Sequence, residues 1–209
     1  WMLYSGEPVA ISDVNLISGK RWPTVMTLED YEQVTGESAF PDNLSRWIEG
    51  GKLNYFCNNQ VTYSVRGAHV KLDVLWDFKA EPGQGDKHFA SFRGSRARVE
   101  IRQGADQNFQ PELYVVPKKE SDLEEVGKAL KQKVDSLQSK WQGVAVEKRD
   151  GEWQVTIPDV YRVGHEAHFS QVARQFLKFL DKSELMPAWE KPNMMAKYFV
   201  TTKGVELGH

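Results

Sequence analysis

Apolar and polar residues alternate over two stretches in the middle of the chain, at 68–79 and at 96–103. A period of two residues is the pattern of a β-strand with one buried and one solvated face. Arg93-Gly94 predicts a tight turn between a strand at 88–93 and the strand at 96–103. We therefore expect three consecutive strands to form an antiparallel meander. In its last strand we expect Ala97, Val99 and Ile101 to be buried, and Arg98, Glu100 and Arg102 to face solvent.

A short helix interrupts the extended segments of the N-terminal third. Residues 12–27 have the pattern of an extended segment. Thr27, with Asp30 three positions later, predicts the N-cap of a helix over 28–34 that ends at Gly36.

The polar run Asn58-Asn59-Gln60 separates two apolar runs of the next segment. It predicts a hairpin turn between strands at 53–57 and 61–65. We expect the same sheet to continue through 68–79, 88–93, 96–103 and 112–116.

After Pro117 the apolar period changes to three and four residues, which is typical of an amphipathic helix. Ser121 with Glu124 predicts a capping box for a helix of about five turns. Asp150-Gly151 then predicts the turn of a hairpin. A second helix carries its apolar residues on one face, at Phe169, Val172, Phe176, Leu177 and Leu180.

Strands followed by helices, without strict alternation, predict an α+β fold. We expect a mostly antiparallel open sheet with helices packed on one face. The absence of a Gly/Ser linker favours a single α+β domain over 1–209, with 118–141 as a helical excursion within it.

Composition and charge exclude several classes of protein. The 209 residues carry a formal net charge of -2 with both signs interspersed, so nucleic acid is not expected as a partner. The cluster Arg93, Arg96, Arg98 and Arg102 is interrupted by Glu100 and is interpreted as a solvated strand face.

The single cysteine and the lack of long apolar runs bear on disulfide bonds and on membrane association. Cys57 cannot form an internal disulfide and is interpreted as a buried or half-buried thiol. No run has the length of a transmembrane helix or the form of a signal peptide, so no membrane partner is expected. The chain begins Trp1-Met2, and we expect it to be cut from something longer. Any targeting sequence would be lost with that part, which leaves the cytoplasm or the bacterial envelope as the compartment.

Asp86, Lys87 and His88 supply an acceptor, a cation and a switchable donor where a loop enters a strand. Binding groups concentrate at such junctions, and an ordinary polar turn is the alternative. The preceding Gly83 and Gly85 do not form a dinucleotide loop, because they join two strands where that loop needs a strand and a helix.

His165 and His168 lie one turn apart at the start of the second predicted helix. Their spacing is one residue short of H-E-x-x-H and no third ligand is near, so we expect no metal. A helix N-terminus disfavours imidazolium, and a neutral histidine can hydrogen-bond a polyol hydroxyl.

Six segments carry a family resemblance: K-R-W-P-T-V (20–25), G-x-G-D-K-H-F-x-x-F-R-G (83–94), V-E-I-R-Q-G (99–104), P-E-L-Y-V-x-P (111–117), G-H-E-A-H-F (164–169) and P-A-W-E-K-P-N-M-M-A-K-Y (187–198). Together they resemble the C-terminal domain of an oxidoreductase branch of the glucose–fructose oxidoreductase / inositol dehydrogenase (Gfo/Idh/MocA) family. The resemblance spans nearly the whole chain.

The resemblance implies a protein of two domains with different functions. An N-terminal Rossmann domain holds NAD or NADP, and a sugar or polyol lies between it and the C-terminal α+β domain. A lysine and often a histidine handle the alcohol proton during hydride transfer. The Rossmann motif is absent here, so this chain is expected to bind no cofactor, and its catalytic partners are expected upstream of Trp1. Lys191 follows Glu190 in the family's E-K-P tripeptide, but at the far end of the chain, and is interpreted as a surface residue.

The leading hypothesis is a substrate-binding and oligomerisation domain of an NAD(P)-dependent sugar or polyol oxidoreductase. Its substrate-binding residues are predicted to be Asp86, Lys87, His88, His165 and His168. The alternative is a non-enzymatic α+β module that binds carbohydrate or protein, and a hydrolase with a metal on His165 and His168 is a third class. We expect a homo-oligomer formed through the sheet face away from the helices, at or beside Leu75, Tyr114, Val116, Trp22 and Trp47.

Overall fold

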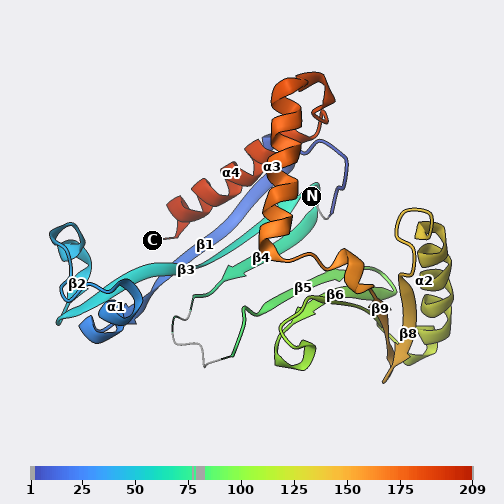
Figure 1. Ribbon diagram of the computed structural model, residues 1–209, viewed down its shortest axis with the longest axis horizontal. Coiled ribbons are helices and arrows are strands. Elements are labelled where there is room, and N and C mark those ends of the chain that lie inside the picture. Colours follow the sequence, from blue (N-terminus) through green and yellow to red (C-terminus); the bar gives the residue numbers. More distant parts are fainter. Residues whose placement is uncertain (1–2, 77, 79–82, 209) are drawn as a thin grey trace. The chain divides into compact units, whose positions relative to one another are not determined.

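The chain folds into two compact units, shown in a computed structural model that describes residues 3–76, 78 and 83–208 (Figure 1). Unit 1 comprises residues 1–79 and 175–209, and unit 2 comprises residues 80–174. Each unit contains one antiparallel sheet, and helices accompany the sheets. The predicted α+β class is confirmed. That residues 1–209 form a single domain stays a prediction.

Unit 1 is built on a four-stranded sheet in the order β1-β3-β2, with β4 paired to β3. Two helices, α1 and α4, belong to this unit together with the C-terminal part of α3. The bounds are β1 (Val14–Met26), α1 (Leu28–Thr35), β2 (Ile48–Glu49), β3 (Lys52–Val65), β4 (Ala68–Val74), α3 (His165–Asp181) and α4 (Glu190–Leu207).

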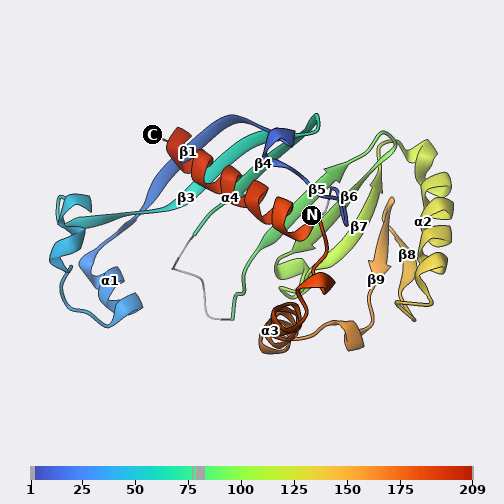
Figure 2. The ribbon, with the colours of Figure 1, turned by 90° about the horizontal axis from the view of Figure 1, so that it is seen from above.

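Helix α4 lies along β1 and β3 and covers one face of the unit 1 sheet (Figure 2). Glycines allow the close approach, because a Cβ on Gly19 would lie 2.3 Å from the carbonyl oxygen of Gly204. Nearer the start of α4, Val9, Val65 and Ala196 form a buried apolar cluster. The helix is therefore fixed to the sheet by backbone contact at one end and by side-chain packing at the other.

The predicted start of α1 is confirmed. The Thr27 side chain accepts a hydrogen bond from the backbone N–H of Asp30 at 3.1 Å, and the Asp30 carboxylate accepts one from the backbone N–H of Thr27 at 3.0 Å. Gly36 ends the helix in the left-handed conformation at φ 78°. Such reciprocal capping satisfies N–H groups that the helix itself leaves unpaired.

The predicted hairpin turn at residues 58–60 is wrong, because β3 runs through it as one strand. Asn58 is buried in the sheet, where its side-chain amide donates to Thr24 Oγ1 at 2.9 Å and its carbonyl oxygen accepts from the Trp76 N–H at 2.8 Å. The chain turns instead at Arg66-Gly67, both with positive φ, which is the requirement of a tight two-residue hairpin. The polar residue Asn58 is therefore a hydrogen-bonding position inside a strand and not part of a turn.

Unit 2 contains a five-stranded sheet in the order β5-β6-β7-β9-β8. The strands are β5 (His88–Arg93), β6 (Ala97–Gln103), β7 (Glu112–Pro117), β8 (Ala145–Arg149) and β9 (Glu152–Thr156). Helix α2 (Leu123–Leu137) and the N-terminal part of α3 belong to this unit. The hairpin at Asp150-Gly151 is confirmed. The predicted hairpin of β5 and β6 is confirmed too, with its turn at residues 94–96 because Arg93 pairs with Arg98. Residues 112–117 therefore supply the third strand of the meander.

The prediction of one continuous sheet is wrong. Strand β4 pairs with β3 and not with β5, because the Arg66-Gly67 turn folds it back on its neighbour in sequence. It ends at Val74, and the N–H of Trp76 bonds to the Asn58 side chain and not to a strand. Part of the predicted strand at 68–79 lies outside the described residues, at 77 and 79.

Helix α2 covers one face of the unit 2 sheet by packing on Trp153 of β9. Trp153 is 4% exposed, and its indole N–H donates to the carbonyl oxygen of Leu123 at 2.9 Å. The predicted Ser121–Glu124 capping box is wrong. A 3-10 turn over Glu120–Asp122 leads into the helix, and the Glu124 carboxylate pairs with Lys148 of β8 at 2.6 Å.

Candidate functional site

The face of the unit 2 sheet opposite α2 carries a row of polar side chains, which we call the open face. Residues paired across strands point to the same side of a sheet. The pairings join Ser91, Glu100, Tyr114, Gln154 and Glu147, one residue from each of five strands. The alternate residues, Val115 and Trp153 among them, face α2.

Glu100 lies at the centre of this row and is 5% exposed. Its carboxylate accepts a hydrogen bond from Arg98 Nε, and two from Arg102, at 2.8 Å from Nε and 2.6 Å from Nη2. The prediction that Glu100 faces solvent is wrong, because its two flanking arginines fold over it. Val99, predicted to be buried, is 36% exposed.

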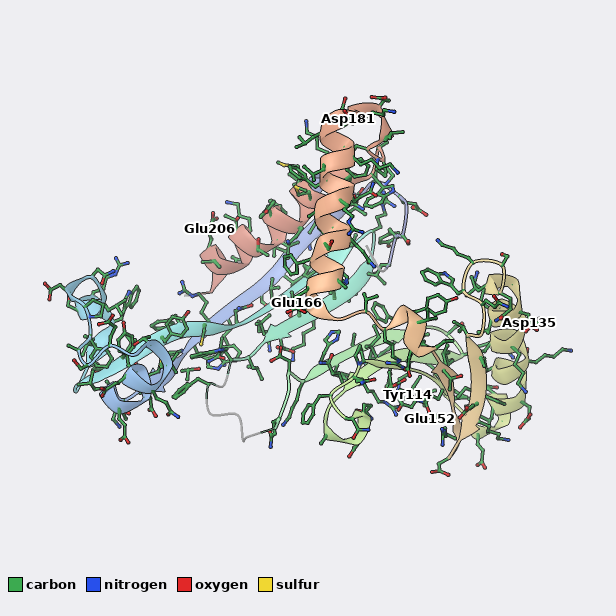
Figure 3. The ribbon with its side chains drawn as sticks, viewed as in Figure 1. Tyr114, Asp135, Glu152, Glu166, Asp181 and Glu206 are labelled. Carbon is green, nitrogen blue, oxygen red and sulfur yellow. The ribbon has the colours of Figure 1, made fainter. Side chains whose placement is uncertain are left out.

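Arg102 connects Glu100 to the neighbouring strands. Its guanidinium donates to both carboxylate oxygens of Glu152 at 2.8 and 2.7 Å and stacks over the ring of Tyr114 at 4.2 Å. Tyr114 and Glu152 lie close together on the sheet in Figure 3. Bidentate pairing to a carboxylate and stacking on an aromatic face are the geometries that arginine provides and lysine does not.

The charges in this network hold each other ionised. Burial raises the pKa of Glu100, but the hydrogen bonds and charges of Arg98 and Arg102 outweigh it and hold that pKa below its usual value. The hydrogen bond to Glu152 is the largest cause that raises the pKa of Arg102 above its usual value, and burial works against it. The carboxylate of Glu100 therefore remains an acceptor at neutral pH and does not serve as a proton donor.

A shallow polar basin of about 460 Å³ lies at one end of the open face. Its floor comes from the strands and its rim from the segment 105–109, where Asn108 and Phe109 have positive φ and redirect the chain into β7. The lining residues are Arg102, Asp106, Gln107, Asn108, Glu112, Tyr114, Arg149, Glu152 and Gln154.

The basin offers hydrogen-bond donors and acceptors. Glu112 is held by Arg162 Nη2 at 2.7 Å, and Glu152 by Arg102. The amides of Asn108 and Gln154 and the Tyr114 hydroxyl both donate and accept. A ligand with several hydroxyl groups matches such a surface, because each hydroxyl also does both. The arrangement is therefore suited to binding a polar ligand.

One of the predicted site segments comes to the rim of this basin. The carbonyl oxygen of Asp86 accepts a hydrogen bond from Gln103 Nε2 at 3.0 Å, and a Cβ on Gly85 would lie 3.0 Å from Phe109 Cβ. The loop before β5 is thereby held against the 105–109 segment. Lys87 is exposed in that loop. His88 is exposed too, and its pairing with Gln103 puts it on the face opposite Arg102.

The two predicted histidines lie elsewhere. His165 and His168 are exposed in the first turn of α3, where the His165 ring contacts Phe169 at 4.8 Å between centroids. Neither lines the basin. Among the residues that the structure describes, no group of three or more His, Cys, Asp and Glu side chains is arranged to hold a metal ion. The role of all five predicted site residues in substrate binding stays a prediction.

Sequence reasoning missed the residues that form the centre of the open face. Glu100, Arg102 and Glu152 were visible as alternating charges on strands, and the register of β6, β7 and β9 brings them together. Opposite charges at matching positions of neighbouring strands were the available signal.

The Gly83-x-Gly85 loop does not have the geometry of a dinucleotide-binding loop. Gly83-x-Gly85 leads into strand β5, and Gly85 packs on Phe109, so no helix N-terminus is aimed at a pyrophosphate there. None of the described helices is both long and apolar enough to span a bilayer.

Comparison with known proteins identifies the family. The family model described as "Putative oxidoreductase C terminal domain" matches residues 1–209. A crystal structure at 2.23 Å resolution, of a "putative oxidoreductase" from Parabacteroides merdae ATCC 43184, is similar over 99% of this chain with 41% sequence identity and a TM-score of 0.93. This chain covers 47% of that protein's chain. A search of curated proteins gives no match.

Proposed function

The chain belongs to the family of oxidoreductase C-terminal domains, and we propose that it is the substrate-binding and oligomerisation domain of an NAD(P)-dependent sugar or polyol oxidoreductase. The observation that carries the proposal is the family match over the whole chain. The chain also spans less than half of the similar solved protein, which supports a second half with a different task.

The finer part of the proposal rests on the resemblance to the glucose–fructose oxidoreductase / inositol dehydrogenase family. In this assignment NAD or NADP is held by the other half of the protein and supplies the hydride chemistry. This chain supplies the polar surface against which a sugar or polyol is oriented. The basin supports this role, because Tyr114, Asn108 and Gln154 present hydrogen-bonding groups beside arginine-paired carboxylates. The groups that move the alcohol proton come from the other half.

The open face also supports the proposed self-association. Val116 lies on it at the end away from the basin, paired with Arg98, and Arg93 pairs with Arg98 on the other side. The other residues expected at the interface are divided between the two units. Tyr114 lies on the open face under Arg102, whereas Leu75, Trp22 and Trp47 belong to unit 1. Two copies related by a two-fold axis would bring this end of the face against itself, with Val116 of each copy at the contact.

One observation favours the alternative of a binding module without an enzymatic partner. The buried carboxylate of the open face, Glu100, is paired with arginines and is held ionised. A surface of this kind can hold carbohydrate or a protein segment without any reaction.

Kinetics of the complete oxidoreductase test the proposal. Gln154→Ala removes one hydrogen-bonding group of the basin, and we expect the KM for the sugar or polyol to rise about tenfold, which is about 1.4 kcal/mol. The dissociation constant for NAD(P) should stay the same, and Gln132→Ala on the exposed side of α2 should change neither. An unchanged KM would place the substrate outside the basin. Absence of NAD(P)-linked turnover with every sugar and polyol tried would favour the binding module.

A further inference from the structure

Large apolar side chains are exposed over a short stretch of unit 1, from the second half of α3 to the first turns of α4. We call this stretch the C-terminal apolar surface. Its members are between 42% and 65% exposed, and they are Phe176, Leu177, Leu180, Leu185, Met186 and Met194.

Helix α3 has the amphipathic pattern of a helix whose apolar side is covered by another part of a protein. Phe176, Leu177 and Leu180 recur at helical spacing on one side of α3, while Lys178 lies on the opposite side. None of the described residues of α3 is buried. Exposed apolar patches of this kind mark interaction sites, and methionines adapt their shape to a partner.

The first residues of the chain are held beside the same part of the fold. The backbone N–H of Val9 donates to Asn193 Oδ1 at 2.6 Å, and Asn193 Nδ2 donates to the carbonyl oxygen of Glu7 at 3.2 Å. Asn193 is buried and immediately precedes Met194 of the apolar surface. A polypeptide that precedes this chain therefore enters unit 1 next to that surface.

We propose that the C-terminal apolar surface is the docking site for the preceding, cofactor-binding half of the oxidoreductase. This inference rests on the proposed function, which assigns such a half. Two observations select this occupant: the similar solved protein has more than half of its chain outside the part matched here, and the N-terminal segment is fixed at the edge of the surface. Interfaces between domains of one chain typically bury about 600–1,500 Å², which six large side chains and their surroundings can supply.

Cysteine labelling in the complete oxidoreductase tests this docking site. Leu180→Cys places a thiol on the apolar side of α3, and Lys178→Cys places one on the opposite side as the matched control. Both variants are treated with a maleimide reagent, and peptide mass spectrometry separates the introduced thiol from Cys57. We expect Leu180→Cys to react at least ten times more slowly than Lys178→Cys in the complete protein. In the 209-residue chain alone the two should react at similar rates.

Three outcomes would overturn the proposal. Equal rates in the complete protein mean that nothing covers the surface. Slow labelling of Leu180→Cys that depends on the concentration of the 209-residue chain means that a second copy covers it. Slow labelling of that chain at every dilution means that the chain covers the surface itself. Titration of the complete protein with NAD(P) is read separately, so a failed proposed function is distinguishable from a failed docking site.

Discussion

Glu100 is a buried carboxylate that the fold retains by surrounding it with arginines. It accepts hydrogen bonds from Arg98 and Arg102, and Arg102 is shared with Glu152. Removing one partner from a buried network leaves the opposite charge without compensation, which costs more than the pair contributes. The stability of the open face therefore depends on this one residue more than on the exposed pairs around it.

Glu100→Gln is expected to lower the free energy of unfolding by about 2 kcal/mol at pH 7, because the hydrogen bonds from Arg98 and Arg102 lose their charged acceptor. Glu147→Gln is the matched control. The pair of Glu147 with Arg149 is half exposed, and its loss should cost about 0.5 kcal/mol or less. Urea unfolding of the two variants and the parent protein measures both values. Equal effects of the two substitutions would show that burial of Glu100 has no energetic consequence.

The same comparison has a pH dependence with a defined sign. The pKa of Glu100 is lowered in the folded state, so its stabilisation is present above the unfolded pKa of about 4.3. It is lost as the pH falls through the lower folded pKa. The difference between parent and Glu100→Gln should therefore shrink between pH 7 and pH 3. A difference that stays constant over this range would contradict the account.

Residue patterns predicted local features well where one residue type imposes one geometry. Thr27 with Asp30, and Gly36 after the helix, fixed the ends of α1 correctly. Asn58 was misread, because an asparagine is equally suited to a turn and to a buried bridge between strands. Only the positions of Thr24 and Trp76, which are distant in sequence, select the bridge.

At the scale of elements, α2 is fixed to its sheet by the contact of Gly127 with Trp153. A Cβ at Gly127 would lie 2.1 Å from Trp153 Cζ2, so the ring occupies the space of the missing side chain. Trp153 also donates to the helix backbone at Leu123. The position of the helix over β9 is therefore set by one glycine and one tryptophan.

Gly127→Ala is expected to destabilise the protein by about 2 kcal/mol, because the added methyl group overlaps the buried ring. Alanine is the better helix former by about 1 kcal/mol, so the helix alone predicts the opposite sign. Lys128→Ala, one position along and exposed, should change stability by no more than about 0.5 kcal/mol. Thermal unfolding followed by tryptophan fluorescence distinguishes the two predictions. A more stable Gly127→Ala variant would mean that α2 does not pack on Trp153.

The positions of the unit 2 strands were predictable from the sequence, but which strands pair with each other was less so. Alternating residues and the turns predicted at Arg93-Gly94 and Asp150-Gly151 placed β5, β6, β8 and β9. The alternation at 68–79 is of the same kind, yet β4 pairs with β3 in the other sheet. A period of two residues indicates which side chains share a face of the strand, but it does not indicate which strand lies next to it. The Arg66-Gly67 turn determines that β4 pairs with β3.

At the scale of the whole molecule, the open face is proposed to join two copies. Val116→Asp adds a charge at the end away from the basin and is expected to dissociate the oligomer of the complete protein. Gln132→Asp on α2 adds the same charge and should leave the oligomer intact. Light scattering at micromolar concentration gives the mass of each variant. A parent protein that stays monomeric up to roughly 100 µM, an affinity no better than about -5.5 kcal/mol, would exclude self-association through this face.

The similarity of the whole chain to an oxidoreductase C-terminal domain was predictable from short motifs distributed over its length. The basin was not, because its lining comes from β6, β7, β8, β9 and the segment 105–109, which only the sheet register brings together. The boundary between the two compact units has no signal in the sequence. No Gly/Ser linker separates them, since α3 runs as one helix through the boundary between residues 174 and 175.

The proposed function is tested by calorimetric titration with NAD+, NADH, NADP+ and NADPH, with the complete oxidoreductase and the 209-residue chain measured side by side. We expect the complete protein to bind at least one of the four with a dissociation constant near 1 µM, about -8 kcal/mol. We expect no binding to the chain alone, because the Gly83-x-Gly85 loop leads into a strand and offers no helix N-terminus to a pyrophosphate. Micromolar binding to the chain alone, or no binding to the complete protein, would overturn the proposed function.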